Sequence, residues 1–220
     1  MTRQEQVTTI RQAVRWLFLF FSMGAGLSPV YAGADGFDQL DRFFEEVSTL
    51  KASFTQVILD ENLLALEESS GLLWIARPGR FRWDYDSVHS QTIVADGEVL
   101  WVYDVELEQV TRRGQETAIG QTPAVLLSGG QQYRKDYKAT VLGRQGAVNW
   151  ISLVPKLSDG SFAEIQLGFE GDTLRLIQLL DELNQITRVT LSDVVENEPI
   201  PDSVFQFIPP AGVDVIGDVE

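Results

Sequence analysis

The sequence predicts a mainly β fold in which about ten antiparallel strands follow one another as a meander, with only a few helices. Three observations support this fold class. Hydrophobic residues alternate at every second position in many segments, turn-forming pairs separate those segments, and no helical period falls between successive strands. Right-handed β-α-β crossovers, and with them a parallel sheet, are therefore not expected.

The composition is that of a folded and acidic protein. The chain has 220 residues, of which 44% are hydrophobic, enough to bury a sizeable core. Its 17 Lys and Arg against 32 Asp and Glu give a formal net charge of −15, which opposes binding to phosphate backbones, so we expect no nucleic acid partner. Without Cys and with a single His, His89, the chain is poorly supplied with zinc or iron–sulfur ligands, and we expect no metal and no cofactor.

The first segment reads as a targeting signal. Three Arg residues precede an apolar run of about 12 residues, and a small-residue cleavage site follows at residues 30–32. We expect a secretory signal peptide over residues 1–32, cleaved between Ala32 and Gly33, and a single mature domain over residues 33–220. The alternative, an uncleaved membrane anchor, is disfavoured because crossing a bilayer takes roughly 20 apolar residues.

Two helices are expected in the mature chain. Apolar residues recur at three- and four-residue steps between Phe37 and Leu50, which indicates one amphipathic helix of about 12 residues. Farther along, Thr122 as N-cap, Pro123 at the first helical position and Gly129 as a stop predict a helix of one or two turns. Two helices are too few to cover such a sheet as solid core, but they suffice to close the mouth of a curved one.

The clearest strand lies at residues 80–86, where Phe81, Trp83 and Tyr85 share one face and charged residues occupy the other. The same alternation appears in a later strand around Trp101, and the Asp-Gly pair at residues 96–97, between the two β-rich runs that flank it, is a strong hairpin signal. A sheet with one apolar face must bury that face by closing into a barrel, by pairing with a second sheet, or by holding helices against its curve.

The search for a catalytic site finds little. His89 lies between serines in a loop-like segment, and the chain contains no Gly-x-Ser-x-Gly motif. Acidic residues are plentiful, but they sit in turns or on polar strand faces, where solvated charge is the usual state. We therefore expect no enzymatic activity.

Arg77 differs from the other basic residues. It follows an apolar strand run and precedes Pro78, so it lies at the rim of whatever the aromatic face lines. A guanidinium there can hold carbonyl or ester oxygens in a forked geometry. From the residues alone, structural capping and gating of a ligand are equally open for this side chain.

Six segments then follow one another in order between residues 73 and 216, within a match that runs across nearly all of residues 37–216. They are LWIARPGRFRW at 73–83, IVADGEVLWVYD at 93–104, LEQVT at 107–111, PAVLL at 123–127, LVPK at 153–156 and FQFIPPAGVDVI at 205–216. In this order and spacing they resemble the LolA family of periplasmic lipoprotein carriers. The membrane-anchored acceptor LolB would need a Cys behind the signal segment, so the resemblance favours the soluble carrier.

The resemblance implies an incomplete antiparallel β-barrel of about eleven strands, closed by a helical lid over an apolar cavity. It also implies a periplasmic monomer that takes acylated lipoproteins from an inner-membrane lipoprotein-releasing ABC transporter and delivers them to LolB. A LolA-like module that senses or stores lipid, without protein cargo, is the alternative. Arg77 maps to lid gating. The expected acyl-chain cavity is lined by Trp74, Phe81, Trp83, Ile93, Trp101 and Leu127.

Overall fold

The computed structural model describes residues 34–86, 90–115, 123–129, 133–157, 162–183 and 185–217. The expected signal peptide at residues 1–32, and also His89 and Thr122, lie outside these described residues. Contacts divide the chain into Met1–Val30 and Tyr31–Glu220, and the fold below is that of the second unit. No helix in the described part of the chain is both long and apolar enough to cross a membrane.

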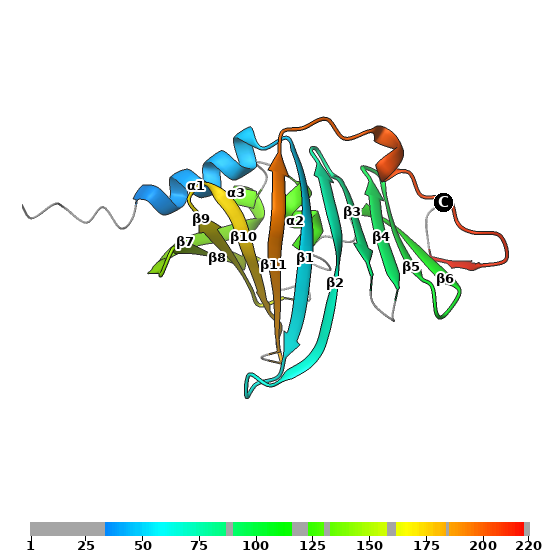
Figure 1. The fold of residues 1–220 in the computed structure, drawn as a ribbon, viewed down its shortest axis with the longest axis horizontal. Helices are drawn as coiled ribbons and strands as arrows, with labels where there is room; N and C mark the ends of the chain where they lie inside the picture. The colour runs from blue at the N-terminus through cyan, green and yellow to red at the C-terminus, as the bar shows by residue number, and fades with distance from the viewer. Residues whose placement is uncertain are drawn as a thin grey trace, which may run out of the picture. The chain divides into compact units, whose positions relative to one another are not determined.

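The described strands form one open sheet of 12 strands in the order β12-β6-β5-β4-β3-β2-β1-β11-β10-β9-β8-β7 (Figure 1). Two meanders, β1 to β6 and β7 to β11, are joined where β1 pairs with β11, and only the β12–β6 pair is parallel. This confirms the mainly β, antiparallel class, with 12 strands where the residue pattern predicted about ten and the resemblance about eleven. The strands are β1 (Thr49–Leu59), β2 (Ala65–Ala76), β3 (Arg80–Tyr85), β4 (Gln91–Asp96), β5 (Val99–Asp104), β6 (Gln109–Gly114), β7 (Tyr137–Gln145), β8 (Val148–Pro155), β9 (Glu164–Glu170), β10 (Thr173–Leu180), β11 (Ile186–Glu196) and β12 (Asp214–Ile216).

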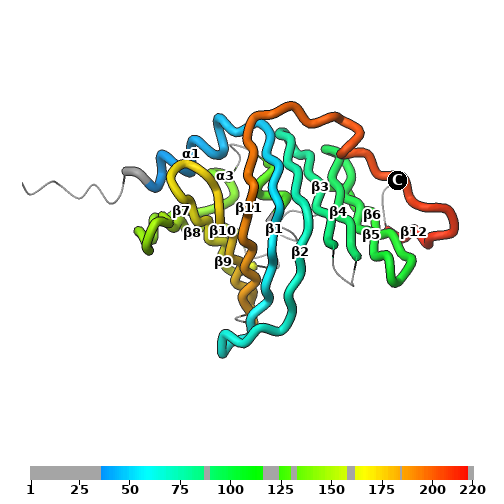
Figure 2. Tube along the Cα trace, viewed as in Figure 1, coloured from blue at the N-terminus to red at the C-terminus, as the bar shows by residue number. Residues whose placement is uncertain are grey.

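Both predicted helices are present, but the first ends before the apolar pattern does, because Leu50 already lies in strand β1. The first, α1 (Ala34–Glu46), packs on β7, β8 and β10, and the second, α2 (Pro123–Ser128), packs on β2 and β3. Two shorter elements, α3 (Tyr133–Asp136) and the 3-10 helix η3 (Asp202–Phe205), were not expected from the sequence pattern. We call the face of the sheet that α1 and α2 contact the inner face. Figure 2 shows β11 and β1 side by side where the two halves of the sheet meet.

The main core lies between the inner face and these helices. Phe43 and Leu40 of α1 and Leu127 of α2 are fully buried against Phe54 and Phe169 of the sheet. The rings of Phe43 and Phe169 meet edge to face with centroids 5.9 Å apart. Because each such side chain contributes about 1.5–3 kcal/mol when it leaves water, this apolar contact is what keeps the short helices in place.

A second cluster covers the outer face of β3, β4 and β5. The C-terminal segment, residues 197–217, runs across this face, where Phe205 is only 2% exposed. The ring of Phe207 lies 5.8 Å from that of Trp101 and 5.9 Å from that of Tyr103. The segment ends in β12, which adds to the sheet edge beside β6. Strand β3, which α2 contacts from the inner side and η3 from the outer side, is therefore covered on both faces.

Candidate functional site

Four of the predicted cavity residues meet on the inner face. Phe81 and Trp83 of β3 are 0% and 2% exposed, and Ile93 of β4 lies directly opposite Trp83 in the strand register. Leu127 enters the same hydrophobic cluster from α2. Trp83 also packs edge to face on Phe54, with ring centroids 5.1 Å apart. The structure thus brings strand and helix residues together in one apolar site.

The structure does not bring Trp74 and Trp101 into this site. Trp74 pairs with Arg82, and Trp101 pairs with Val94, so both project from the outer face. The physical reason lies in their strands, which are apolar at consecutive positions, so alternation alone cannot say which face points inward. Trp74 lines an outer groove of about 310 Å³ next to Lys51 and the start of the C-terminal segment.

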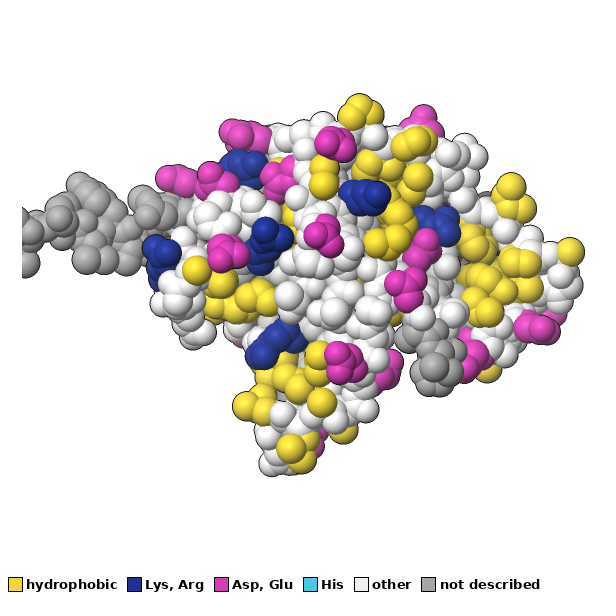
Figure 3. All heavy atoms as spheres, viewed as in Figure 1, with side chains coloured by type: hydrophobic (Ala, Val, Ile, Leu, Met, Phe, Trp, Pro, Cys, Tyr) yellow, Lys and Arg dark blue, Asp and Glu magenta, His cyan; other side chains and the backbone are white. Residues whose placement is uncertain are grey.

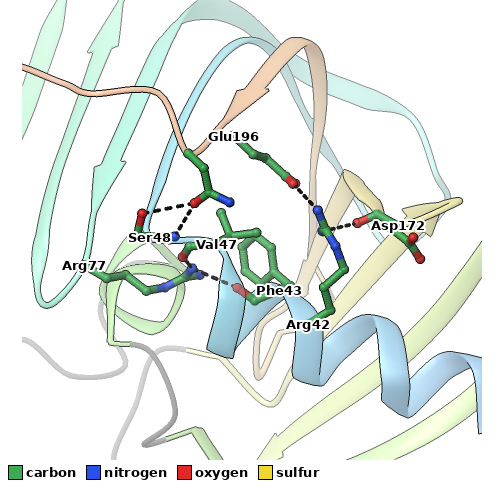
Figure 4. A network of polar contacts seen from close by, with 8 residues as sticks. Arg42, Phe43, Val47, Ser48, Arg77, Asp172 and Glu196 are labelled. Carbon is green, nitrogen blue, oxygen red and sulfur yellow. Dashed lines mark hydrogen bonds and ion pairs between the residues drawn. The ribbon is translucent and has the colours of Figure 1, made fainter.

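Arg77 joins both helices at the rim of the inner face. Its Nε donates to the Leu127 carbonyl of α2 at 3.0 Å, and its Nη1 donates to the Phe43 carbonyl of α1 at 2.8 Å. Nη1 also donates to the carbonyl of Val47, directly after α1. Figure 4 shows the guanidinium aimed at the end of α1. The C-terminal ends of both helices present unsatisfied carbonyls with partial negative charge, which suits a cation.

The Arg77 charge is held without a carboxylate. In the described part of the chain its partners are the backbone carbonyls and the rings of Phe43 and Phe44, whose centroids lie 4.5 and 5.4 Å from the guanidinium carbon. Burial lowers the pKa of Arg77 to about 10, although Glu196 opposes the shift. Nη2 is buried without a hydrogen-bond partner among described residues.

The sequence reasoning missed a second tie on α1. Arg42 pairs with Glu196 at 2.7 Å and donates to the Asp172 carbonyl at 2.9 Å (Figure 4). Just beyond the helix, the backbone N–H of Ser48 donates to the Asn197 side chain at 2.8 Å. The only available signal was the rarity of basic residues in this acidic chain, because the partners lie about 130 to 154 positions away.

A third tie links α1 to α3. Asp41 accepts hydrogen bonds from the Tyr133 hydroxyl, at 2.6 Å, and from Arg134. Burial would raise the pKa of Asp41, but the hydrogen bonds from Arg134 and Tyr133 lower it, and the result lies below the ordinary value. Tyr133 also stacks on Phe44, with ring centroids 4.4 Å apart. The helix is thus fixed along its length by polar side chains at the surface.

The chemistry of the site is that of apolar binding. Among the described residues, no group of three or more His, Cys, Asp or Glu is placed to hold a metal ion. The inner face offers rings and aliphatic chains, and the polar groups at its rim bind helix backbone. Such a surface is suited to apolar chains.

Comparisons with known proteins agree with one another. The sequence matches the family model for outer membrane lipoprotein carrier protein LolA over residues 45–208. The outer-membrane lipoprotein carrier protein of Methylobacillus flagellatus is 38% identical over 205 residues, which cover 93% of this chain and 100% of that protein. Its namesake from Chromobacterium violaceum is 40% identical over 195 residues, 89% of this chain and 93% of that one. A crystal structure of an uncharacterized conserved protein from Thermus thermophilus superposes with a TM-score of 0.53 at 12% identity, covering 82% and 97% of the two chains, and shares the fold alone.

Proposed function

Because the chain belongs to the LolA family of outer membrane lipoprotein carriers, we propose that it ferries acylated lipoproteins across the periplasm. It takes them from an inner-membrane lipoprotein-releasing ABC transporter and hands them to the outer-membrane acceptor LolB. The signal peptide at residues 1–32 sends the chain to the periplasm, where the mature protein works as a monomer and without enzymatic activity. The names and full-length coverage of its relatives support this proposal.

Transport of acylated lipoproteins through water requires an apolar surface on the carrier. Each methylene of an acyl chain contributes about 0.8 kcal/mol of membrane affinity, so a lipoprotein with several chains does not leave a bilayer unaided. The carrier supplies a shielded surface of intermediate affinity. The energy for extraction comes from the ATP-driven donor, and the acceptor completes the transfer by binding more tightly.

The observation that supports the proposal is the burial of the apolar side chains on the inner face of β3 beneath α2. Phe81, Trp83 and Leu127 are at most 2% exposed, so an acyl chain reaches them only if α1 and α2 move away from the sheet. Those helices are short, and side chains at their ends and surfaces fix them. We propose that they form a lid over the cargo, with Phe81, Trp83, Ile93 and Leu127 lining the space that opens.

Arg77 acts in this proposal as the latch of the lid. Its guanidinium binds the carbonyl ends of α1 and α2 at once, so separating the helices from the sheet breaks these bonds together. Their reformation after cargo leaves restores the closed lid and opposes rebinding. The sequence left two roles open for Arg77: capping of structure and gating of a ligand. In this proposal they are one role, because capping the two helix ends is what keeps the lid closed.

The test is extraction and transfer of a lipoprotein by purified components. Inner membranes that hold the transporter are incubated with the mature carrier and ATP, and mass spectrometry then identifies what the soluble carrier has bound. We expect triacylated lipoprotein, released only with ATP and passed on to purified LolB. A carrier that retains lipid alone would instead support the lipid-sensing alternative, and a carrier that binds neither would contradict the proposal.

A further inference from the structure

The turn between β1 and β2 holds leucines out in solvent on an ordered backbone. The Asp60 carboxylate accepts hydrogen bonds from the backbone N–H groups of Asn62 and Leu64, both at 2.8 Å. The Asp60 N–H in turn donates to the Leu64 carbonyl at 3.0 Å. Leu63 and Leu64 are 63% and 64% exposed, and Leu66 at the start of β2 is 59% exposed. The apolar side chains are thus held in place before any contact is made.

The backbone at Leu63 carries a cost. Its φ is 63°, in the left-handed region that favours glycine and is uncommon for leucine. A glycine would fit this turn with less strain, and it would also remove the exposed side chain. Strain kept together with exposed apolar surface indicates a use for that surface.

The turn between β10 and β11 repeats the same construction. The Asp181 carboxylate accepts hydrogen bonds from the backbone N–H groups of Leu183 and Gln185, both at 2.8 Å. The Asp181 N–H donates to the Gln185 carbonyl at 3.1 Å, as the Asp60 N–H does to its partner in the first turn. Leu183 is 83% exposed. Two separate parts of the chain therefore expose leucine on the same kind of aspartate-bonded turn, although Leu183 follows its aspartate by two residues and Leu63 by three.

The two turns are neighbours at one end of the sheet. Leu59, the last residue of β1, pairs with Ile186, the first residue of β11, so the turn before β11 lies beside the turn after β1. Figure 3 shows hydrophobic side chains gathered at this lower end, with acidic side chains beside them. We call the four exposed side chains the leucine patch: Leu63, Leu64, Leu66 and Leu183.

The charges around the leucine patch decide what can bind it. Residues 60–68 and 181–188 contain six acidic side chains and a single basic one, Arg188, which donates to Gln178. Segments that bind membrane surfaces combine apolar residues with Lys and Arg, because the bilayer surface is negatively charged. An acidic border opposes such contact. It matches instead a protein surface whose rim is basic.

We propose that the leucine patch is a docking surface for a protein partner of the carrier, one that offers an apolar groove edged by Lys and Arg. The proposal rests on the function given above, which requires a donor and an acceptor that the carrier must recognise. It adds a surface remote from Arg77, which lies where β2 ends, whereas the patch lies where β2 begins.

The experiment measures the affinity of the mature carrier for three probes: the purified transporter in detergent, purified LolB, and vesicles of phosphatidylethanolamine and phosphatidylglycerol. The variants are Leu63→Gly and Leu183→Ser. The matched control is Ile208→Ser, which removes a side chain that is 85% exposed outside the patch. Fatty-acid binding and the thermal midpoint are recorded for every variant.

We expect each patch variant to bind one of the two proteins about tenfold more weakly, a loss of about 1.4 kcal/mol, with Ile208→Ser and fatty-acid binding unchanged. Leu63→Gly should not lower the thermal midpoint, because glycine suits the left-handed backbone. A charge-removing pair, Glu61→Gln with Glu182→Gln, should weaken the same complex and reduce its salt dependence.

Unchanged affinity for both proteins would overturn the docking proposal and leave the carrier function intact. The docking proposal would also be overturned if the variants lost binding to vesicles instead, because the patch would then bind a membrane. It would be overturned as well if the parent self-associated and the variants did not, because the patch would then bind a second copy of the chain. A lower midpoint for Leu63→Gly would assign the turn to stability. If the parent binds neither protein, the carrier function itself fails, and the docking proposal fails with it.

Discussion

Strand β3 carries two covers, one on each face, and the covers are fastened differently. On the inner face, α2 is a separate short helix, tied to the end of β2 and the turn after it: its Leu127 carbonyl accepts from Arg77 and its Ser128 carbonyl accepts from the Gly79 N–H. On the outer face, the C-terminal segment is held by the ion pair of Arg80 with Asp202, at 2.6 Å, by Phe205, and by β12, which joins the sheet itself. The outer cover is built into the sheet, whereas the inner cover is separable from it. This difference fits an inner face that opens and an outer face that does not.

The largest expected effect comes from removing one buried aromatic ring from each face of the sheet. Phe81→Ala and Phe205→Ala remove rings that are 0% and 2% exposed, so each should lower the free energy of unfolding by about 3–5 kcal/mol in denaturant titration. Only Phe81→Ala should weaken the binding of a fluorescent fatty acid.

The milder Phe81→Leu provides a folded variant if the alanine variant is too unstable. Equal loss of fatty-acid binding in Phe81→Ala and Phe205→Ala would show that the two faces do not differ in function. Leu127→Asp should abolish fatty-acid binding from the helix side, because a carboxylate cannot share the apolar site.

The next largest effect distinguishes Arg77, which binds the inner cover, from Arg80, which binds the outer cover. Arg77→Leu should load lipoprotein normally yet transfer it to LolB at least about tenfold more slowly, because α1 and α2, the lid proposed above, lose the hydrogen bonds that close them over an empty site. Arg77→Lys should be intermediate, since an ammonium keeps the charge but not the forked geometry. The measurement is transfer from purified loaded carrier.

Arg80→Leu is the matched control for Arg77→Leu, because its partner Asp202 is mostly exposed and a surface pair of this kind contributes less than about 1 kcal/mol. Transfer by this variant should equal that of the parent. Normal release by Arg77→Leu, with equal loading, would return Arg77 to a purely structural role.

A smaller effect concerns the tie between Arg42 and Glu196. Glu196→Gln removes the ion pair but keeps the shape, and should lower the free energy of unfolding by less than about 1 kcal/mol. If this tie restrains α1 over the inner face, a fluorescent fatty acid should enter the variant faster in stopped-flow mixing. An unchanged entry rate would mean that α1 stays in place while cargo enters.

The smallest effect is a pH dependence at Asp41. Because the hydrogen bonds from Arg134 and Tyr133 outweigh burial, the pKa of Asp41 lies below its ordinary value of 3.8. Its contribution to stability is therefore fully present above pH 3.8 and is lost as the pH falls through the lowered pKa. The difference in unfolding free energy between the parent and Asp41→Asn should shrink over that acid range. A difference that is constant with pH would contradict the assignment.

The strength of the sequence pattern decided which parts of the sheet could be predicted. In β3, rings alternate with charges, so the inward face of Phe81 and Trp83 follows from the sequence alone. Trp74 and Trp101 lie in strands that are apolar at successive positions, and their outward direction depends on which cover each face receives. The sequence of each strand does not contain this information, because the outer cover is the C-terminal segment, which lies far away in the chain.

The candidate site divides in the same way. The place of Arg77 between an apolar strand and Pro78 indicated a rim position, but its acceptors, Phe43 and Leu127, lie 34 and 50 residues away in sequence. No local sequence pattern predicts which carbonyls Arg77 binds. By contrast, the two aspartate turns did carry a local signal, since Asp60 and Asp181 are each followed by Glu and then by leucine within three residues. The pattern became meaningful only when the register placed the turns side by side.

The pairing of β1 with β11 also fixes the order in which the molecule can be completed. Phe54 pairs with Leu191, so the strand nearest the start of the fold waits for one of the last to be synthesised. Each meander can form from near neighbours, but the seam between them closes only after almost the whole chain is available. Until β11 has been synthesised, one edge of β1 has no partner strand, so the sheet cannot be completed before synthesis of the chain is nearly finished.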